Sequence, residues 1–292
     1  KLTTAFPFLS QANSVTIQAD GKIVVGGYTY KGPGFQNQFA LVRYNPDGSL
    51  DNSFDGDGKL TTDIGPVNSA ANAVTIQKDG KIVAAGYARI GLNLEFALTR
   101  YNTDGSLDNS FDGDGLLTTP FGYSPFEASV QSVAIQGDDK IMLAGTNQNN
   151  NILNKNVALA RYNADGSLDN GFGTGGIVNY DLLGTANEEG WAMTLYGNRI
   201  YVAGTIISER QEDCLIAAFQ DDVVTCPGTA GNTYYRDEDG DGFGNPTLPI
   251  EACSLPKGYA DNNTDCDDNN AAVNQGAEEI CGNHIDDDCD GR

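Results

Sequence analysis

The chain has 292 residues, 39% of them hydrophobic, which is enough for one large or two ordinary domains with a real core. Its 40 acidic and 17 basic residues give a net charge of −23, which argues against nucleic acid and anionic membrane surfaces as partners. No apolar run is long enough to span a membrane. The chain begins at Lys1 without Met or a signal peptide, so we expect a processed or trimmed piece of a longer protein.

The first 225 residues contain an internal repeat. The segment FALVRYNPDGSLDNSFDGDG at 39–58 returns almost unchanged at 96–115 and more loosely at 157–176. A shortened fourth copy is visible at 215–219. Equivalent points lie 57 to 61 residues apart, which indicates four repeats, placed at about 1–58, 59–115, 116–176 and 177–225.

Each repeat is predicted to contain strands. Its segments of four to six residues are rich in Val, Ile, Thr and Tyr and are bounded by Gly, Asn and Asp. Asp20-Gly21 and Asp79-Gly80 indicate tight hairpins, and Asn198 marks the same turn in the fourth repeat. Counting the Leu-Thr-Thr stretch that opens the early repeats, each supplies about four strands. This pattern predicts an all-β fold of tandem four-stranded propeller-type blades, with a parallel β-helix as the alternative.

The motifs DGSLDxSF, F-A-L-x-R-Y and DGKI-x-x-x-G resemble those of the delta-60 repeat, a bacterial β-propeller-like family of large secreted and surface proteins. The resemblance covers roughly residues 1–220 and implies a propeller-type fold without a known activity. A four-bladed ring, an open stack and a ring completed by other sequence are all compatible with four repeats.

Two recurring polar positions in the repeats are interpreted as structural. Asp55-Gly-Asp57 and Asp112-Gly-Asp114 look like cation loops, but the third repeat has Gly-Thr-Gly at 173–175, so solvated turns are favoured. The recurring arginines are expected to pair with nearby aspartates. These pairs are Arg43 with Asp47, Arg100 with Asp104, and Arg161 with Asp165.

Residues 226–292 differ in composition from the repeats and are predicted to form a second, loop-rich domain. They hold 15 acidic and 3 basic residues and five of the six cysteines, and the sixth, Cys214, lies shortly before them, so the boundary is placed near Val224. The even number of cysteines suggests disulfides and an oxidising compartment. Zinc is the less favoured reading because no Cys-x2-Cys pair is present.

The stretch YYRDEDGDGFGN at 234–245 predicts a calcium loop. Asp237, Asp239 and Asp241 occupy positions 1, 3 and 5 of a D-x-D-x-D-G pattern, and the backbone carbonyl of Phe243 falls at position 7. Hard oxygen ligands of this kind suit Ca²⁺. Position 12 is Leu248 instead of Glu, so the loop is not an EF-hand. The candidates for the closing carboxylate are Asp261, Asp265 and Glu251.

Two further clusters have the same spacing. The second consists of Asp265, Asp267 and Asn269, with Glu278 or Glu279 to close it, and the third consists of Asp286, Asp288 and Asp290. A disordered acidic tail is the alternative. Interleaved cysteines and aromatic residues argue against disorder, because calcium and disulfides can stabilise a segment that has few apolar residues.

The residues YYRDEDGDGFGN, the Cys253…Gly258-Tyr259 stretch, TDCDD at 264–268 and EICGN…DDDCDG at 279–291 resemble a metal-binding motif of bacterial surface proteins. That motif is named from a methanotroph copper-binding protein and is akin to thrombospondin type 3 calcium repeats. The resemblance implies disulfides Cys253–Cys266 and Cys281–Cys289, which leaves Cys214–Cys226 to join the last repeat to the tail. Copper is not expected, because His284 is the only His.

The chemistry needed for catalysis is not evident in the sequence, so we predict that the chain is not an enzyme. A single His excludes a credible Ser-His or Cys-His pair.

We expect instead a secreted or surface protein of bacterial type. In it the propeller serves as a platform for adhesion or fibre assembly, with other copies, surface proteins or carbohydrate as partners, and the tail serves as a stalk that calcium makes rigid. A carbohydrate-active propeller, glycosidase or lyase, with the tail as a passive spacer is the alternative.

Overall fold

The fold is described from a computed structural model. It covers residues 2–291 except 33–35, 122–127, 149–154, 182–186, 197–198, 209–210, 221–231, 253–257, 268, 281–282, 284 and 290. Within these residues no helix is long and apolar enough to cross a membrane.

Two compact units are present. The propeller unit comprises Lys1–Asp169 with Gly176–Asp221, and the C-terminal unit comprises Asn170–Gly175 with Asp222–Arg292. The predicted boundary at Val224 lies outside the described residues.

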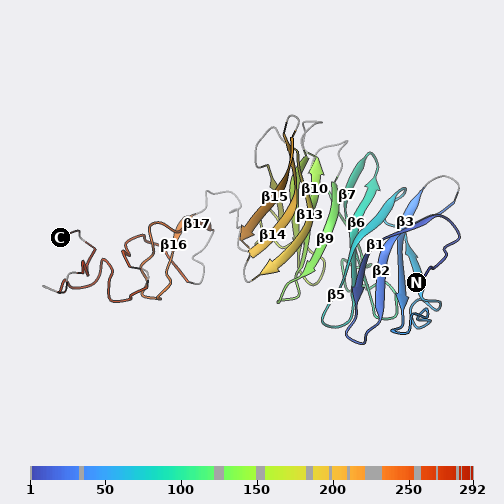
Figure 1. Cartoon of the computed structure of the whole chain (residues 1–292), viewed down its shortest axis with the longest axis horizontal. Helices are drawn as coiled ribbons and strands as arrows, with labels where there is room; N and C mark the ends of the chain where they lie inside the picture. The colour runs from blue at the N-terminus through green and yellow to red at the C-terminus, as the bar shows by residue number, and fades with distance from the viewer. Residues whose placement is uncertain are drawn as a thin grey trace. The chain divides into compact units, whose positions relative to one another are not determined.

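The propeller unit consists of four antiparallel sheets that follow one another in chain order (Figure 1). Sheet 1 contains β1 (Ser10–Ile17), β2 (Ile23–Tyr30), β3 (Asn37–Tyr44) and β4 (Lys59–Thr62). Sheet 2 contains β5 (Ser69–Ile76), β6 (Ile82–Ile90), β7 (Asn93–Tyr101) and β8 (Leu116–Thr119). Sheet 3 contains β9 (Ala128–Ile135), β10 (Ile141–Gln148), β11 (Lys155–Tyr162) and β12 (Ile177–Tyr180). Sheet 4 contains β13 (Asn187–Tyr196), β14 (Arg199–Ser208) and β15 (Gln211–Gln220).

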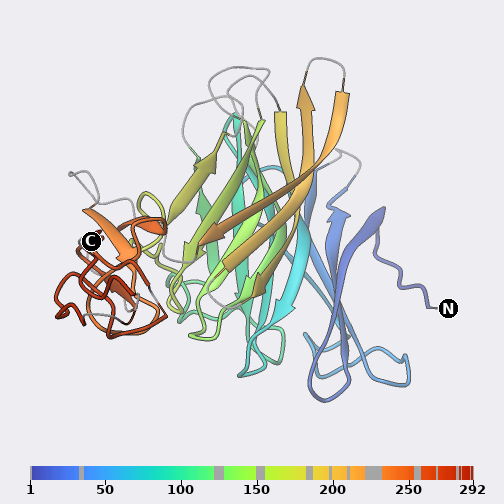
Figure 2. The ribbon, with the colours of Figure 1, turned by 60° about the vertical axis from the view of Figure 1, so that its left-hand side comes forward.

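This architecture confirms the predicted all-β class and its four-stranded propeller-type sheets. Within each sheet, consecutive strands are neighbours, so every sheet is a meander. Sheets 1 and 4 lie at opposite ends of the row, with sheets 2 and 3 between them (Figure 1). The described residues therefore do not form a closed four-bladed ring. In the turned view of Figure 2, the strands of sheet 4 overlap those of sheets 2 and 3.

The boundaries of the sheets differ from those of the sequence repeats. The Leu-Thr-Thr stretch was expected to open the second repeat, but as β4 it pairs with β3 of sheet 1, with Leu41 opposite Leu60. The reason lies in the preceding loop, where the amide of Arg43 donates to the carbonyl of Gly58 and turns the chain back along β3. β8 pairs with β7 in the same way. Each complete sheet thus takes its outer strand from the start of the following repeat.

Glycine in the motif DGKI-x-x-x-G is required by a close backbone approach. The first strand of each sheet bulges toward the second, between Ala71 and Ala73 in sheet 2. A Cβ on Gly86 would lie 1.9 Å from the carbonyl oxygen of Ala70. Gly27, Gly145 and Gly204 meet the same obstacle in the other sheets. The motif therefore encodes contact between two strands rather than a flexible turn.

The hydrophobic core lies between the sheets. One cluster joins Val24 and Leu41 of sheet 1 to Val74 and Ala84 of sheet 2. A second cluster joins sheet 2 to sheet 3 in the same manner, through residues such as Leu98 and Val130. The face of each sheet that packs against the following sheet is called its forward face, and the opposite one its rear face. Burying these faces against one another supplies the main stabilisation of the stack.

A buried ion-pair network accompanies each contact between sheets. Arg43 Nε lies 2.7 Å from Asp51 Oδ2, and Lys22 Nζ lies 3.3 Å from the same oxygen. The pairs Arg100–Asp108 and Arg161–Asp169 repeat this arrangement, each at 2.7 Å. The predicted partners Asp47, Asp104 and Asp165 were wrong. Each of these three carboxylates instead accepts a bond from the backbone amide and the hydroxyl of the serine two positions later, which closes its own turn.

The C-terminal unit has little regular structure. Its described strands are β16 (Asn232–Arg236), β17 (Pro249–Ala252) and β18 (Tyr259–Ala260), in the order β17-β16-β18. Among its described residues, Phe172, Tyr234, Ala260 and Val273 are buried apolar residues. Loops and one disulfide make up the rest of its described part, so side-chain hydrogen bonds and charge carry more of the fold here than in the propeller unit.

Candidate functional sites: metal centres and a polar groove

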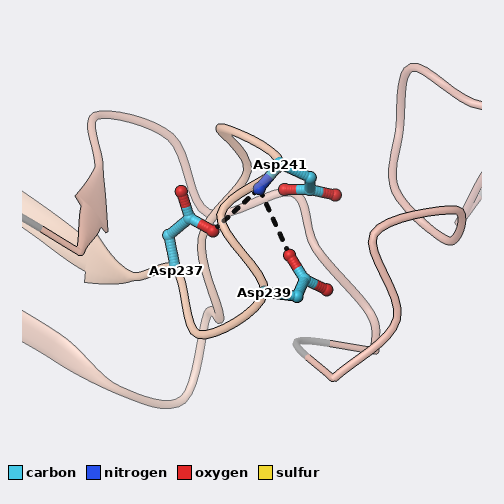
Figure 3. A group of neighbouring side chains, drawn as sticks. All are labelled: Asp237, Asp239 and Asp241. Atoms are coloured by element: carbon cyan, nitrogen blue, oxygen red, sulfur yellow. Dashed lines mark hydrogen bonds between the residues drawn. The ribbon is translucent and has the colours of Figure 1, made fainter.

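The first acidic loop follows β16 directly and brings three carboxylates together. Ligand oxygens of Asp237, Asp239 and Asp241 all lie within 4.8 Å of one another (Figure 3). Asp237 shapes the loop, because its carboxylate accepts the amides of Gly240 at 2.7 Å and Gly242 at 3.1 Å. Both glycines have positive φ, at 78° and 91°, which the turn requires. The predicted cluster is therefore formed by local backbone geometry.

Two asparagines distant in sequence hold this loop in place. Asn274 Nδ2 donates to Asp241 Oδ2 at 2.8 Å, and Asn262 Nδ2 donates to the carbonyl of Gly242 at 2.9 Å. Sequence reasoning missed both residues, because nothing in their spacing links them to the D-x-D-x-D-G pattern. Both bonds join the loop to segments that lie far from it in the sequence.

The predicted candidates for the closing carboxylate do not lie with the three aspartates of the first loop, as far as the structure describes them. Neither Asp261 nor Asp265 joins the group of three carboxylates, and the side chain of Glu251 is not described. Leu248, at position 12, is partly exposed and has no oxygen to offer. The amide of Phe243 donates to Asp241 Oδ1 at 2.8 Å, while its carbonyl as a ligand stays a prediction.

The second predicted cluster, of Asp265, Asp267 and Asn269, stays a prediction. Asp265 is buried, whereas Asp267, Asn269 and Glu278 are exposed. Asp265 Oδ1 accepts the amide of Asp267 at 2.8 Å, which is a local turn contact. No group of three acidic or other charged ligands forms at this loop among the residues described.

The third cluster assembles with a member from elsewhere. Asp286 and Asp288 come together with Glu279, and their ligand oxygens lie within 4.8 Å of one another. Glu279 was considered as a closing ligand of the second loop, but it lies with the third. Its carboxylate also accepts the amide of Asp287 at 2.9 Å, which folds the segment back on itself. The predicted ligand Asp290 lies outside the described residues, as does His284.

The disulfide pairing differs from the one that the family resemblance implied. Cys266 is bonded to Cys289, with their Cα atoms 5.9 Å apart, so the pairs Cys253–Cys266 and Cys281–Cys289 are wrong. The amide of Asn274 donates to the carbonyl of Asp287 at 3.0 Å, so the last loop packs beside the second one. Cys214 is free and exposed, against the predicted pair with Cys226, which itself lies outside the described residues with Cys253 and Cys281.

The donor chemistry of both assembled clusters fits a hard divalent cation. Three carboxylates this close repel one another, by about 1 kcal/mol per pair even at the dielectric constant of water. The adjacent Arg236 pairs with Glu238 rather than with the trio. All donors are oxygens, which suits Ca²⁺ or Mg²⁺ better than copper or zinc. Asp237, Asp239 and Asp241 would hold one ion, and Glu279, Asp286 and Asp288 a second.

The propeller unit contains a polar groove across the first strands of sheets 1 to 3. The groove has a volume of about 590 Å³, and its polar lining residues are Gln11, Asn13, Tyr28, Asn72, Tyr87 and Gln131. Asn13, Asn72 and Gln131 occupy the bulges of β1, β5 and β9. Asn13 Nδ2 donates to the carbonyl of Ala71 at 2.9 Å, which fixes its orientation. Apart from Ala12 and Ala70, the lining consists of amides and phenols, which together offer donors, acceptors and aromatic faces without net charge.

The fold and the acidic loops define a β-propeller repeat protein that carries a metal-binding motif. Three segments of the chain, residues 18–54, 77–111 and 136–172, match the family model described as "Domain of unknown function (DUF5122) beta-propeller". These are followed by the "Putative metal-binding motif", matched at 265–292, which includes the third acidic cluster. Both matches confirm the architecture expected from the resemblances. No curated protein sequence matches the chain.

Solved structures similar to the chain include several enzymes. A virginiamycin B lyase from Staphylococcus aureus is 15% identical with a TM-score of 0.35, covering 80% of this chain, which spans 61% of that protein. An endo-arabinase from Bacteroides thetaiotaomicron is 12% identical with a TM-score of 0.41. The match covers 73% of this chain and 75% of that enzyme. An α-L-arabinofuranosidase from Fusarium graminearum is 11% identical with a TM-score of 0.45. The match covers 80% of this chain and 72% of that enzyme.

These structures correct the prediction that the chain is not an enzyme. The similar structures are a lyase and glycoside hydrolases, so this type of fold does not support excluding catalysis. At identities of 7–15% the similarity concerns the fold alone and assigns no activity to this chain. The prediction is withdrawn.

Proposed function

We propose that the chain is a calcium-binding interaction module, in which calcium orders the C-terminal unit and the propeller unit presents the surfaces that bind partners. The observation that carries the proposal is the convergence of Asp237, Asp239 and Asp241 at one point directly after β16. Such a concentration of charge is stable only when a cation compensates it, or when solvent and salt screen it.

Calcium is favoured over magnesium by the geometry of the loop. Ca²⁺ accepts six to eight oxygens with flexible geometry, whereas Mg²⁺ demands a near-ideal octahedron. The bonds from Asn274 to Asp241 and from Asn262 to the carbonyl of Gly242 tie the loop to the rest of the unit. Loops of this type in extracellular modules bind calcium at about 10⁻⁴–10⁻³ M, which would keep the unit ordered outside the cell.

We infer a secreted or cell-surface location from the same features. Weak calcium loops are occupied at extracellular calcium levels, and the disulfide Cys266–Cys289 persists in an oxidising compartment. The net charge of −23 keeps such a module soluble while binding cations. A chain fractionated from its native cells and found only in the reducing cytosol would contradict this location.

The test is a calorimetric melt of the oxidised chain in millimolar calcium and in excess EGTA, with bound metal counted by elemental analysis. A ligand that binds only the folded state raises its stability. The chain has a single tryptophan, Trp191 in β13, so its fluorescence follows the propeller unit alone. We expect calcium to raise the transition of the C-terminal unit and to leave the Trp191 transition unchanged, with two ions bound per chain. A melt that chelation does not alter, with no calcium found, would overturn the proposal.

A second candidate function is carbohydrate recognition, with or without turnover, at the polar groove. The lining of amides and tyrosines in a volume of about 590 Å³ favours it, because uncharged donors, acceptors and aromatic faces suit a neutral sugar chain. A screen of neutral and acidic polysaccharides, read for both binding and release of reducing ends, tests this candidate. Tyr87→Ala should abolish a signal from the groove, while Tyr196→Ala, an exposed tyrosine outside it, is the control.

A further inference from the structure

The polar groove follows one register position from sheet to sheet. Asn13, Asn72 and Gln131 are the extra residues at the bulges of β1, β5 and β9. Asn13 Nδ2 donates to Asn72 Oδ1 at 3.3 Å, and Asn72 Nδ2 donates to Ser129 Oγ at 3.1 Å. Gln131 Nε2 donates to the same hydroxyl at 3.3 Å. The bulge side chains therefore form a continuous line that crosses the strands of three sheets.

Sheet 4 has an aromatic residue at the same register position. Trp191 is the extra residue at the bulge of β13, where the other three sheets have amide side chains. Its side chain is 49% exposed, and its indole nitrogen donates to Thr205 Oγ1 at 3.2 Å, which restrains the ring. A restrained and half-exposed ring offers an apolar face to a ligand at a low cost in conformational entropy.

Printed contacts connect the groove on sheet 3 to this tryptophan. β13 packs against β9 and β10 (Figure 1). The amide of Gly190, the residue before Trp191, donates to Thr146 Oγ1 at 3.2 Å. Thr146 in turn is the register partner of Ser129, the residue that binds Gln131. The line of bulge side chains therefore continues from sheet 3 to sheet 4.

The charges along this line favour a neutral ligand. No charged side chain lines the groove, although the chain has a net charge of −23. In sheet 4, Glu189 lies opposite Thr205, and its carboxylate is 2.5 Å from Lys155 Nζ, so its charge is compensated. An anionic ligand would find no cation in the lining, and a cationic ligand would find no carboxylate there.

The hydrogen-bonding groups of the two tyrosines suit hydroxyl groups. Tyr87 Oη accepts a bond from Asn37 Nδ2 at 3.4 Å, which leaves its own proton to donate. Tyr28 Oη donates to Gln11 Oε1 at 3.0 Å, which leaves its oxygen to accept. A hydroxyl group both donates and accepts, whereas a carboxylate only accepts and an ammonium only donates. One donor and one acceptor in the same groove therefore favour a ligand that is rich in hydroxyl groups.

We propose that the polar groove and Trp191 form one extended site for an unbranched neutral polysaccharide, whose chain runs across the strands from sheet 1 to sheet 4. Sugar rings combine hydroxyl groups with apolar faces, so they match amides and tyrosines followed by an exposed indole. Tyr28 and Tyr87 bind the first units of the chain, and Trp191 stacks on a later one. The inference rests on the second candidate function, carbohydrate recognition at the groove, and adds the direction, length and charge of the ligand.

The test uses Trp191 as a reporter, because it is the only tryptophan in the sequence. The ligands are malto-, cello- and xylooligosaccharides, each from disaccharide to octasaccharide, with oligogalacturonates as the acidic counterpart. In at least one neutral series, the affinity measured by calorimetric titration should rise by at least about tenfold from the shortest to the longest chains. The emission of Trp191 should change with the long chains and stay constant with the short ones.

Variants separate the two parts of the site. Trp191→Ala should cancel the gain with chain length and leave the binding of short chains unchanged, while Trp191→Phe, which keeps an aromatic face, should retain part of the gain. Tyr87→Ala should abolish the binding of chains of every length. Tyr196→Ala, at an exposed tyrosine of the same strand as Trp191, is the control and should bind as wild type does. A calorimetric melt, which needs no tryptophan, checks that each variant folds.

The outcomes distinguish this inference from the function on which it rests. Binding that is independent of chain length, with constant Trp191 emission, overturns the extended site and leaves carbohydrate recognition at the groove intact. Tighter binding of oligogalacturonates than of every neutral series overturns the neutral ligand. If none of the series binds, the extended site and the second candidate function both fail. The proposed role of calcium is unaffected by these results, since it concerns the C-terminal unit.

Discussion

Arg100 joins two sheets through one side chain. Its Nε donates to Asp108 Oδ2 at 2.7 Å, while its Nη1 donates to the carbonyl of Ala164 in the turn that follows β11 of sheet 3. The guanidinium also lies over the ring of Phe111, 4.5 Å from its centroid. Arg43 makes the same three contacts one repeat earlier, with Asp51, Thr103 and Phe54. The arginine of F-A-L-x-R-Y, held by the Asp and Phe of DGSLDxSF, therefore joins consecutive sheets.

Arg100→Met should destabilise the propeller unit strongly, because it leaves the buried carboxylate of Asp108 with Lys81 as its only cationic partner. Breaking a buried pair costs about 3–5 kcal/mol, and Lys81 compensates part of this. Urea unfolding followed by Trp191 fluorescence measures the loss. Arg89→Met, at a half-buried arginine of the same sheet without a carboxylate partner in the described residues, is the control. Equal stability of the two variants would contradict a joining role.

The stability of the propeller unit should fall as the pH is lowered from about 4 toward 2, because two buried aspartates must then take up protons. Burial acts to raise the pKa of Asp51, but hydrogen bonds from Ser53 and the charge of Arg43 outweigh it and lower that pKa to about 2. Asp108 has a pKa of about 2 for the equivalent reasons. In the unfolded chain an aspartate titrates near 3.9. The lowered pKa values therefore stabilise the fold above about pH 4, and this stabilisation is lost as the pH falls toward 2.

The measurement is the free energy of unfolding as a function of pH, with Trp191 as the probe and EGTA present. The double variant Asp51→Asn with Asp108→Asn should be less stable than wild type at neutral pH and should lose less stability on acidification. Asp57→Asn with Asp114→Asn, at exposed turn carboxylates, is the matched control and should follow the wild-type curve. Parallel curves for wild type and the buried double variant would show that these carboxylates do not carry the acid sensitivity.

Asp239→Asn should remove one calcium ion and Asp288→Asn the other, because each takes one charge from a group of three carboxylates. Calorimetric titration of each variant should show one fewer site, or an affinity lower by at least about tenfold. Asp261→Asn, at an exposed carboxylate outside both groups, should bind as wild type does. An unchanged stoichiometry in Asp239→Asn would place the ion elsewhere.

The bond Cys266–Cys289 should be the linkage recovered by peptide mapping of the oxidised chain under non-reducing conditions. Cys266→Ser should destabilise the C-terminal unit by about 3 kcal/mol, since the bond closes a loop of more than twenty residues. Cys214→Ser should have no effect on stability, because that thiol is free and exposed. Recovery of a Cys281–Cys289 peptide instead would restore the pairing implied by the family resemblance.

Gly86→Ala should destabilise sheet 2 by several kcal/mol, because its Cβ would lie 1.9 Å from the backbone carbonyl of Ala70. The change cannot be absorbed by a side-chain rotation, since the obstacle is backbone. Gly137→Ala is the control, because a Cβ there meets no atom within 4 Å. Both variants are compared by thermal unfolding followed through Trp191, and similar melting temperatures would rule out the close contact.

The strands were predictable from the sequence because each is short, β-branched and bounded by turn residues, although sheet 4 has three described strands where about four were expected. Assigning the outer strands was not, since the Leu-Thr-Thr stretch has the same pattern whichever neighbour it pairs with. The partner of Arg43 posed a similar problem. Asp47 and Asp51 both follow it closely in sequence, and only the turn geometry decides that Asp47 binds Ser49 while Asp51 faces the guanidinium.

The first acidic loop was predictable because its three aspartates lie close together in the sequence and its glycines set the turn. The third was predictable only in part, because Glu279 joins it through a fold of the chain that no local pattern encodes. Asn262 and Asn274 escaped notice for the same reason. Long-range contacts in a unit with few apolar residues depend on individual hydrogen bonds, and these have no periodic signature.

The sharing of strands between repeats affects how the propeller unit responds to force. β4 belongs by hydrogen bonding to sheet 1, yet a single connection leads from it into sheet 2. Tension that extracts the second repeat would therefore strip the outer strand from the first, so the load on one repeat is passed to its neighbour. A unit built in this way should unfold under tension in overlapping steps, each of which releases more chain than one repeat contains, instead of unfolding one repeat at a time.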